Sequence, residues 1–224
     1  MTTTKDSQHW SSTLEAKHDE VREAVISGID WVLARRKQAL IVLGGVAVLL
    51  LLAAVATVAR RARKADAWDR YAVAELLAFG GRPTEAIDAA RKLAVDHAGT
   101  RAASLALLLE GDILQARGEH AAALTAFSKA AEEGGPLTPF AMADKAMTHE
   151  SAGACAEALA AASSFLESSS DHFLAPLVLG VQARCQSALG RGDDAKSTLQ
   201  KMTLQYPDSP WAAWANARLS PATK

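Results

Sequence analysis

The sequence has few aromatic residues and almost no net charge. The first property disfavours a β-sheet fold, and the second disfavours binding to nucleic acid. Aromatic side chains make up 5% of the 224 residues, while half of all residues are apolar, mostly Ala and Leu. This balance favours helices over strands, which prefer aromatic and β-branched residues. The net charge is −1, and no stretch interleaves basic with aromatic side chains, so nucleic acid is an unsuitable partner. The composition predicts an all-α protein.

Motifs of catalytic and metal sites are also missing. The sequence contains no HExxH, no GxSxG and no glycine-rich phosphate loop, and its two cysteines do not form a CxxC pair. We therefore predict a protein that is not an enzyme and that needs no metal and no cofactor.

One long apolar segment covers residues 39–59. It has 21 residues without a charge, and basic residues flank it on both sides, including Arg35, Arg36 and Lys37 before it and Arg60 and Arg61 after it. As a helix it would be about 31 Å long, which matches the hydrocarbon core of a bilayer. A buried core helix and a cleaved signal peptide are the alternatives, and the basic flanks and the long leader disfavour them. We predict a transmembrane helix at 38–60.

Charge does not decide which side of the membrane each end occupies. Within 20 residues of the span, four Lys or Arg residues precede it and five follow it. The preceding tail, residues 1–37, has apolar residues at helical spacing within 12–37. These predict an amphipathic helix for the membrane surface or a partner, with a solvated tail as the alternative.

A repeat of helical hairpins is predicted for residues 65–220. Gly81, Gly118, Gly153 and Gly190 recur at intervals of 37, 35 and 37 residues, and an Ala follows each after five positions. The glycine would end the first helix of a hairpin, and the alanine would let the second helix pack closely. The second unit resembles the tetratricopeptide repeat, with Gly111 where the two helices cross and Phe127 a turn after Ala123. An ordinary helical bundle is the alternative.

This reading gives a solenoid of about four hairpins with a C-terminal capping helix. The hairpins pair residues 65–79 with 83–96, 100–117 with 120–132, 138–152 with 155–168, and 172–189 with 193–204; the cap is 209–219.

In tetratricopeptide domains, the first helices of successive hairpins line a groove. The resemblance places largely apolar residues there: Trp68, Tyr71, Phe79, Leu105, Leu108, Asp112, Phe140, Met147, Leu177 and Arg184. If accessible, they indicate a site for extended or helical apolar segments of other proteins. The alternative is that most of them belong to the core between helices. Glu75 and Asp112 would repel an anion, which disfavours binding of a C-terminal carboxylate.

The layout of tail, span and Ala-rich repeats resembles the YfgM family, particularly over AIDAARKLAVDHAGTRAASLALLLEGDILQARGEHAAALTAF. The resemblance implies a bacterial inner-membrane protein that is an ancillary subunit of the Sec translocon. Its repeats would lie in the periplasm, where they would work with a membrane-anchored chaperone on secreted or envelope proteins. The alternatives are a structural scaffold of an envelope or cell-division complex and a scaffold that faces the cytoplasm. The oligomeric state stays open.

A periplasmic location would give the cysteines a role. Cys155 begins one predicted helix and Cys185 lies late in the next, antiparallel helix, so the two are candidates for a disulfide. Two separate buried thiols are the alternative.

Overall fold

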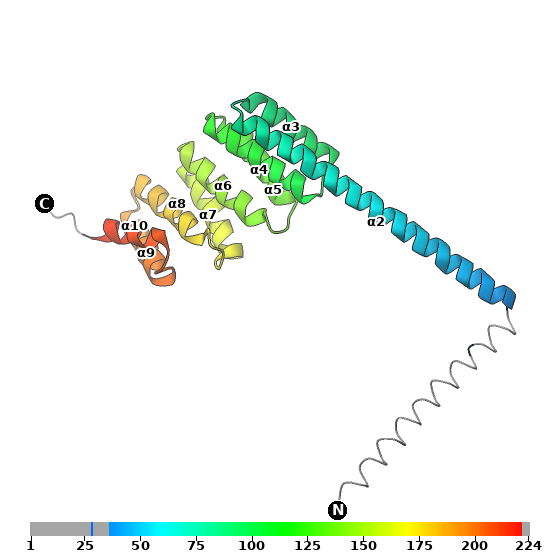
Figure 1. Ribbon diagram of the computed structural model, residues 1–224. Helices are drawn as coiled ribbons and strands as arrows, with labels where there is room; N and C mark the ends of the chain where they lie inside the picture. Colours follow the sequence, from blue (N-terminus) through cyan, green and yellow to red (C-terminus); the bar gives the residue numbers. More distant parts are fainter. Residues whose placement is uncertain (1–27, 29–35, 221–224) are drawn as a thin grey trace, which may run out of the picture. The chain divides into compact units, whose positions relative to one another are not determined.

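The computed structural model describes residue 28 and residues 36–220, and the chain divides into two compact units at Arg60 and Arg61. Helix α2 (Arg36–Phe79) begins in the first unit (Figure 1). Within it lies one segment that is long and apolar enough to cross a membrane, and its large side chains, such as Leu43, Leu50 and Val58, are exposed. This segment is a candidate membrane span. The amphipathic helix predicted within 12–37 lies almost wholly outside the described residues.

The helix predicted for residues 65–79 is the last part of α2 and does not start anew after the candidate span. Residues 60–64, RRARK, contain neither Gly nor Pro, and Arg, Ala and Lys all favour helices. Nothing in this stretch therefore ends the helix.

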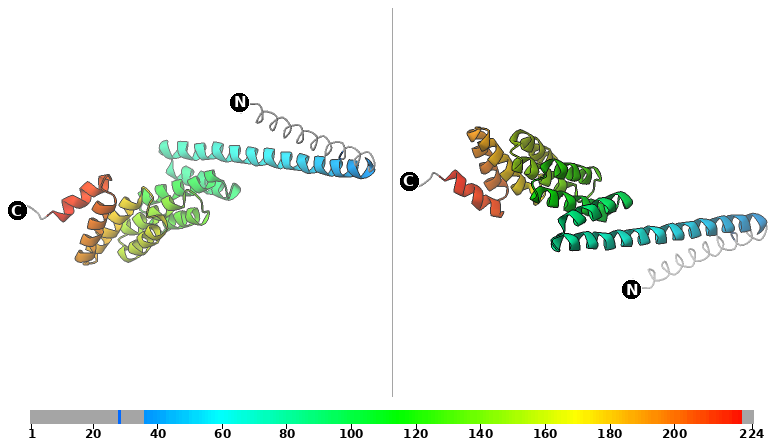
Figure 2. Two further views of the ribbon diagram at one scale, coloured as in Figure 1. Left: turned by 90° about the horizontal axis from the view of Figure 1, so that it is seen from below. Right: turned by 90° about the horizontal axis from the view of Figure 1, so that it is seen from above.

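The second unit, whose described part (residues 61–220) we call the repeat domain, consists of helices that pair in sequence order (Figures 1 and 2). No strand occurs between residues 61 and 220. After α2 come α3 (Pro83–Asp96), α4 (Arg101–Ala116), α5 (His120–Glu132), α6 (Thr138–Ser151), α7 (Cys155–Ser169), α8 (Ala175–Ala188), α9 (Gly192–Gln205) and α10 (Pro210–Leu219). The predicted all-α solenoid of four hairpins with a capping helix is confirmed.

The four turn glycines adopt the conformation that the repeat requires. Gly81, Gly118, Gly153 and Gly190 have φ between 72° and 75°, a region that side chains with a Cβ disfavour. In every turn the N–H of the following residue donates to the carbonyl five residues back, as in Glu119 to Leu114 at 2.9 Å and in the turns after Gly81, Gly153 and Gly190. This bond satisfies carbonyls that the helix end leaves free, so each first helix stops in the same way.

Small residues let the two helices of a hairpin approach each other. Gly111 faces the ring of Phe127, and a Cβ at Gly111 would overlap that ring. Phe127 is fully buried, so the ring has little room to move. In the other hairpins the position of Gly111 is taken by buried alanines, Ala74, Ala146 and Ala183. The second hairpin thus accommodates a large ring because it has glycine where the other three have alanine.

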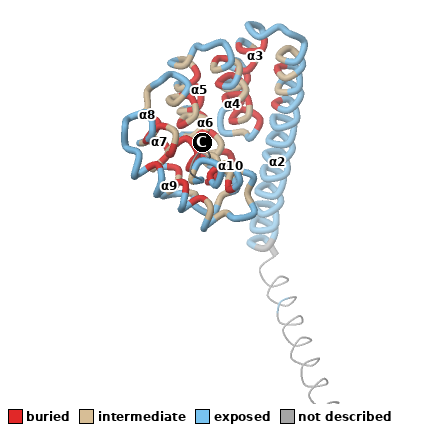
Figure 3. Tube along the Cα trace, turned by 90° about the vertical axis from the view of Figure 1, so that its left-hand side faces the viewer, coloured by how far each residue is buried: buried red, intermediate tan, exposed pale blue. Residues whose placement is uncertain are grey.

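The core continues from hairpin to hairpin as a series of apolar clusters. Buried positions lie where neighbouring helices face one another (Figure 3). Phe127 centres the cluster of the second hairpin, and Phe165 that of the third. At the C-terminal end, Ala215 of α10 joins Leu199 and Met202, so α10 covers apolar side chains of α8 and α9. The capping role predicted for this helix follows from these contacts.

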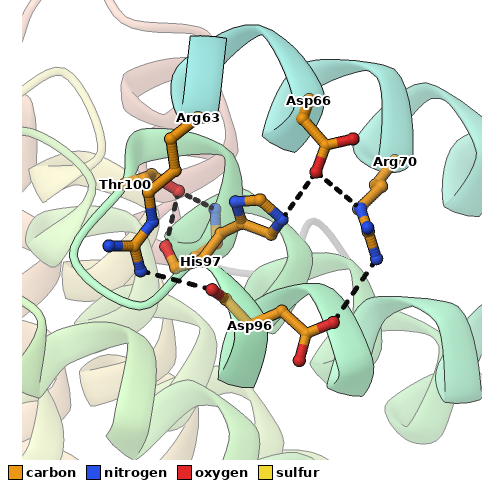
Figure 4. A network of polar contacts seen from close by, with 7 residues as sticks. Arg63, Asp66, Arg70, Asp96, His97 and Thr100 are labelled. Atoms are coloured by element: carbon orange, nitrogen blue, oxygen red, sulfur yellow. Dashed lines mark hydrogen bonds and ion pairs between the residues drawn. The ribbon is translucent and has the colours of Figure 1, made fainter. Parts of the chain in front are cut away.

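A polar network fixes the last part of α2 to the end of α3 (Figure 4). Asp66 Oδ2 lies 3.0 Å from Nε2 of the buried His97 and accepts a hydrogen bond of 2.9 Å from Arg70. Arg70 also reaches Asp96 at 3.4 Å, and Arg63 donates to the Asp96 carbonyl at 3.2 Å. These contacts complement the apolar packing of Ala67 and Ala74 in the same hairpin.

Candidate protein-binding surface

The first helices of the repeat domain bring four polar side chains together. We call Tyr71 and Glu75 of α2, Asp112 of α4 and Asp144 of α6 the acidic row. Tyr71 donates a hydrogen bond of 3.1 Å to Glu75. Burial is the largest cause of the raised pKa values of Tyr71 and Asp144, and the charge of Asp112 adds to both, so Asp112 lies near enough to α2 and α6 to act on each. Negative charge is therefore concentrated on the face that the repeat resemblance assigns to binding.

Burial makes this charge unfavourable. It raises the pKa of Asp112 to about 6, and it raises the pKa of Asp144 to about 7 with a further contribution from the charge of Asp112. The pKa of Tyr71 is raised to about 12. Burial is the largest cause of this increase, and the hydrogen bond to Glu75 is the second. Among the residues that the structure describes, neither Asp112 nor Asp144 forms an ion pair. A basic group brought to this face would relieve the repulsion.

An apolar cavity of 530 Å³ lies at the other end of the repeat domain, between the start of α8 and the turn before α10. Phe173, Leu177, Tyr206 and Trp211 contribute its apolar walls, and the Phe173 side chain is 71% exposed. Nearby, Phe140 packs edge to face on Phe173, with ring centroids 5.7 Å apart. Exposed aromatic walls of this kind suit an apolar or aromatic side chain of a partner.

The predicted groove residues differ in how far they are accessible. Leu108 belongs to the core, with 8% exposure, because the helix turns it toward Ile87 and Phe127. At the opposite extreme, Phe79 is 88% exposed. Trp68 is 44% exposed and packs edge to face on Tyr71. The remaining apolar candidates are partly buried: Leu105, Phe140, Met147 and Leu177.

Arg184 is partly exposed and is held by contacts within the domain. Its guanidinium forms two hydrogen bonds with Glu150, at 2.5 and 2.8 Å, and lies 5.8 and 5.6 Å from the ring centres of Trp211 and Trp214. These contacts join α6, α8 and α10. We therefore assign Arg184 to the attachment of the capping helix, since its charge is already neutralised by Glu150.

The two cysteines lie close together as free thiols. Cys185 is fully buried in the core of the third hairpin, and the partly exposed Cys155 packs against that core. Burial, followed by a hydrogen bond with Cys155, raises the pKa of the Cys185 thiol well above its ordinary value. The disulfide stays a prediction, which the neighbouring positions of the two side chains support.

A second cavity, of 580 Å³, lies among α3, α4 and α5. Its walls carry Arg91, Glu110 and Lys129, and Arg91 is paired with the buried Glu110 at 2.7 Å. Basic and acidic groups are mixed there, so this cavity has less uncompensated charge than the acidic row.

Sequence reasoning noted Glu75 and Asp112 but missed Asp144. The helix of Asp144 carries Ala141, Ala143 and Ala146, all fully buried. The alanines around Asp144 are visible in the sequence, but their burial, which leaves Asp144 only partly exposed, is known from the structure alone. Phe173 and Trp211 were missed because they lie around turns, whose mutual approach the repeat pattern does not predict.

Comparisons with known proteins agree with this fold. The tetratricopeptide repeat family matches residues 182–209. Among solved structures, MamA matches with 17% identity and a TM-score of 0.54, covering 66% of this chain and 85% of MamA. The nearly identical TPR-like repeats of a kinesin light chain from Podosopora anserina match with 13% identity and a TM-score of 0.53, covering 67% and 82%. No curated protein sequence matches. The repeat domain is a helical solenoid of the tetratricopeptide type.

Proposed function

We propose that this chain is a membrane-tethered protein-binding module. Its repeat domain would hold a segment of another protein along the first helices, with a basic side chain at the acidic row and an apolar or aromatic one at the cavity beside Phe173. The tetratricopeptide-type fold supports binding of extended or helical segments. The candidate span in α2 supports the tether.

The acidic row is the observation that carries this proposal. Asp144 is a partly buried carboxylate and Asp112 an exposed one at the edge of the same face, and the raised pKa values of both reflect an unfavourable environment for their charge. Such an arrangement destabilises the free protein and is relieved when a Lys or Arg of a partner arrives. The cavity wall of Phe173, Leu177 and Trp211 then adds an apolar contact that selects among basic segments.

The place of action follows from the resemblance to the YfgM family. We propose that the repeat domain faces the periplasm of a bacterial cell and assists secreted or envelope proteins near the Sec translocon, together with a membrane-anchored chaperone. A segment that leaves the translocon before it has folded would expose both basic and apolar side chains. A scaffold role in an envelope or cell-division complex uses the same surface with a permanent partner, and a scaffold that faces the cytoplasm is the remaining alternative.

A crosslinking experiment tests the surface in the full-length protein within its native membrane. A photoreactive residue replaces Leu177 at the cavity or, as the control, Lys196 on the exposed side of α9. We expect partners at Leu177 and few at Lys196, identified by mass spectrometry. Equal capture at both positions would contradict the proposed surface.

Charge reversal tests the acidic row itself. Asp112→Lys with Asp144→Lys should abolish capture at position 177, because two added positive charges repel a basic segment. The matched control is Asp88→Lys with Glu157→Lys, which changes the net charge equally at exposed positions of α3 and α7. If both pairs reduce capture equally, the effect is one of overall charge and the row is not the site.

Topology and place are tested separately. A reporter fused after Lys224 that is active on one side of the membrane distinguishes a periplasmic from a cytoplasmic repeat domain. Purification in mild detergent then shows whether translocon subunits and chaperones accompany the protein. A stable stoichiometric partner without translocon subunits would favour the scaffold.

A further inference from the structure

The last part of α2 exposes an apolar face on the side away from the repeat domain core. Ala67 and Ala74 are fully buried and mark the inner side of this helix. On the opposite side Leu76 is 72% exposed and Phe79 is 88% exposed, and three alanines between residues 61 and 73 are exposed with them. We call Ala62, Ala65, Ala72, Leu76 and Phe79 the outer stripe. An exposed face with two large apolar side chains indicates an interaction surface.

The outer stripe has the spacing of a coiled-coil seam. Its residues, together with Asp69, recur at alternating intervals of three and four positions, as in the seam of a coiled coil. The full series is Ala62, Ala65, Asp69, Ala72, Leu76 and Phe79. A seam of this period packs best against a second helix that carries the same period.

We propose that the partner of the outer stripe is a second copy of this chain, aligned in parallel and in register. The proposal rests on the membrane tether proposed above. Two copies anchored in one bilayer point the same way and stand at the same depth, which sets a parallel orientation without a shift. If residues 39–59 span the bilayer, the tail before them is on the other side of the membrane and cannot reach the outer stripe.

Charge at the flanks of the seam fits this alignment. In a parallel pair, the residue just before the first seam position of each seven-residue repeat, here Ala62 or Asp69, faces the residue five positions further along the other chain. Arg61 then faces Asp66 of the second copy. Asp66 makes both of its contacts within the chain through Oδ2, to Arg70 and His97, so Oδ1 is left for the second copy. The pair of opposite charges favours the proposed register.

The next flanking pair in the same register is apolar. Trp68 faces Val73 of the second copy, and Val73 borders a largely apolar pocket of 240 Å³ between α2 and α3. Leu93 and Ala89 form other walls of this pocket. Trp68 is 44% exposed in the single chain and has area to bury there. An aromatic side chain that enters a partner's pocket is a typical anchor of an interface.

Asp69 falls within the seam and opposes tight pairing. Two facing aspartates repel each other, as charged residues at seam positions do, but a polar residue there also fixes the register. The paired state is accordingly weaker than it would be with an apolar residue at position 69. Replacing Asp69 should therefore strengthen the pair, which is the opposite of what substitutions of Leu76 should do.

Cysteine crosslinking of the full-length protein in native membranes tests the pair. Ala65→Cys and Ala72→Cys should form disulfide-linked dimers on mild oxidation, whereas Lys64→Cys, an exposed neighbour off the seam, should not. The parent chain reports the background from Cys155 and Cys185. Adding Leu76→Glu to Ala65→Cys should lower the crosslinked fraction by about tenfold, as for loss of a buried anchor. Asp69→Asn should raise it.

Several results would overturn the pair. Equal crosslinking at positions 64, 65 and 72 would mean random collisions in the membrane, and crosslinks to a different protein at 65 and 72 would mean another occupant. Retention of the protein after alkaline carbonate extraction is measured in the same samples. Retention without crosslinks refutes the pair and leaves the tether standing. Release from the membrane with crosslinks at 65 and 72 refutes the tether alone, and release without crosslinks refutes both.

Discussion

The carboxylates of Asp112 and Asp144, on two successive first helices of the solenoid, disfavour each other's charge. Repulsion from Asp112 adds to burial in raising the pKa of Asp144 to about 7. The repulsion between these two carboxylates therefore acts across two first helices, α4 and α6. A segment that binds across both helices could reduce this repulsion with a single basic side chain.

This relationship predicts how stability depends on pH. The pKa values of Asp112 and Asp144 in the folded state, about 6 and about 7, lie above the ordinary value of 3.8. The folded state therefore binds protons that the unfolded chain has lost, so the contribution of these groups is greatest below pH 3.8 and is lost as pH rises through 6 and 7. Urea unfolding of the full-length protein in detergent between pH 5 and pH 8 measures the trend.

Comparing the parent with variants separates the effect of Asp112 and Asp144 on the pH dependence of stability from the effect of other titrating groups. Asp112→Asn with Asp144→Asn should reduce the loss of stability between pH 5 and pH 8 and should stabilise the protein at pH 8. Asp88→Asn, at an exposed position of α3, should leave the pH trend unchanged. A parent and a double variant with the same pH trend would contradict the raised pKa values.

The contact between Asp66 and His97 predicts a loss of stability on mutation. Asp66→Ala removes the partner of His97 Nε2, and the imidazole is buried, so its ring nitrogen would be left unsatisfied. Such a loss costs about 1–3 kcal/mol of unfolding free energy. Denaturant unfolding monitored by circular dichroism measures it. An exposed carboxylate of α3, Asp88→Ala, is the control and should change stability by less than about 0.5 kcal/mol.

The approach of Gly111 to Phe127 predicts that alanine is not tolerated at position 111. The added Cβ would overlap a fully buried ring, which costs about 1–3 kcal/mol, while the better helix propensity of alanine returns about 1 kcal/mol. We expect Gly111→Ala to lower the melting temperature. Gly192→Ala, where the Cβ would meet nothing, should not.

A double variant separates overlap from other effects at this position. Phe127→Leu alone should destabilise the core, but combined with Gly111→Ala it should lose less stability than the sum of the single variants, since the smaller side chain makes room. Additive losses would contradict the overlap.

The neighbouring thiols predict a disulfide in an oxidising compartment. Joining Cys155 and Cys185 would close a loop and stabilise the folded state by about 3.5 kcal/mol in the chain-entropy model. Protein isolated from its native membrane with a thiol-blocking reagent should then show no free thiols until it is reduced. Cys155→Ala, which removes the bond at the partly exposed position, should be about as stable as the reduced parent and less stable than the oxidised one. Two blocked thiols in the freshly isolated parent would show that the bond does not form.

The regular parts of the fold could be predicted from the sequence, and the surface only partly. The spacing of Gly81, Gly118, Gly153 and Gly190 predicted the hairpins because a positive φ at a helix end has few solutions other than glycine. The boundary of 83–96 was predicted to the residue, since a proline begins that helix. Each hairpin is formed by residues that are close together in the sequence, so a short sequence pattern is enough to predict it.

The rotation of each helix was harder to predict. Leu108 and Leu105 lie three positions apart on one helix, but Leu108 is buried and Leu105 is only partly buried. A shift of one residue turns a helical position by 100°, which is enough to move a side chain from the surface into the core. The cavity beside Phe173 depends on how the turn before α8 approaches the turn before α10, and no short sequence pattern records this.

The four identical turns allow the domain to change length in whole steps. The first helix of each hairpin ends with the same glycine conformation and the same hydrogen bond, and each helix packs chiefly on its neighbours in sequence. A hairpin duplicated or deleted between two such glycines would meet the same kind of junction on either side. The face formed by the first helices could then be lengthened or shortened by one helix at a time while the cap around Arg184 and the attachment around His97 stay intact.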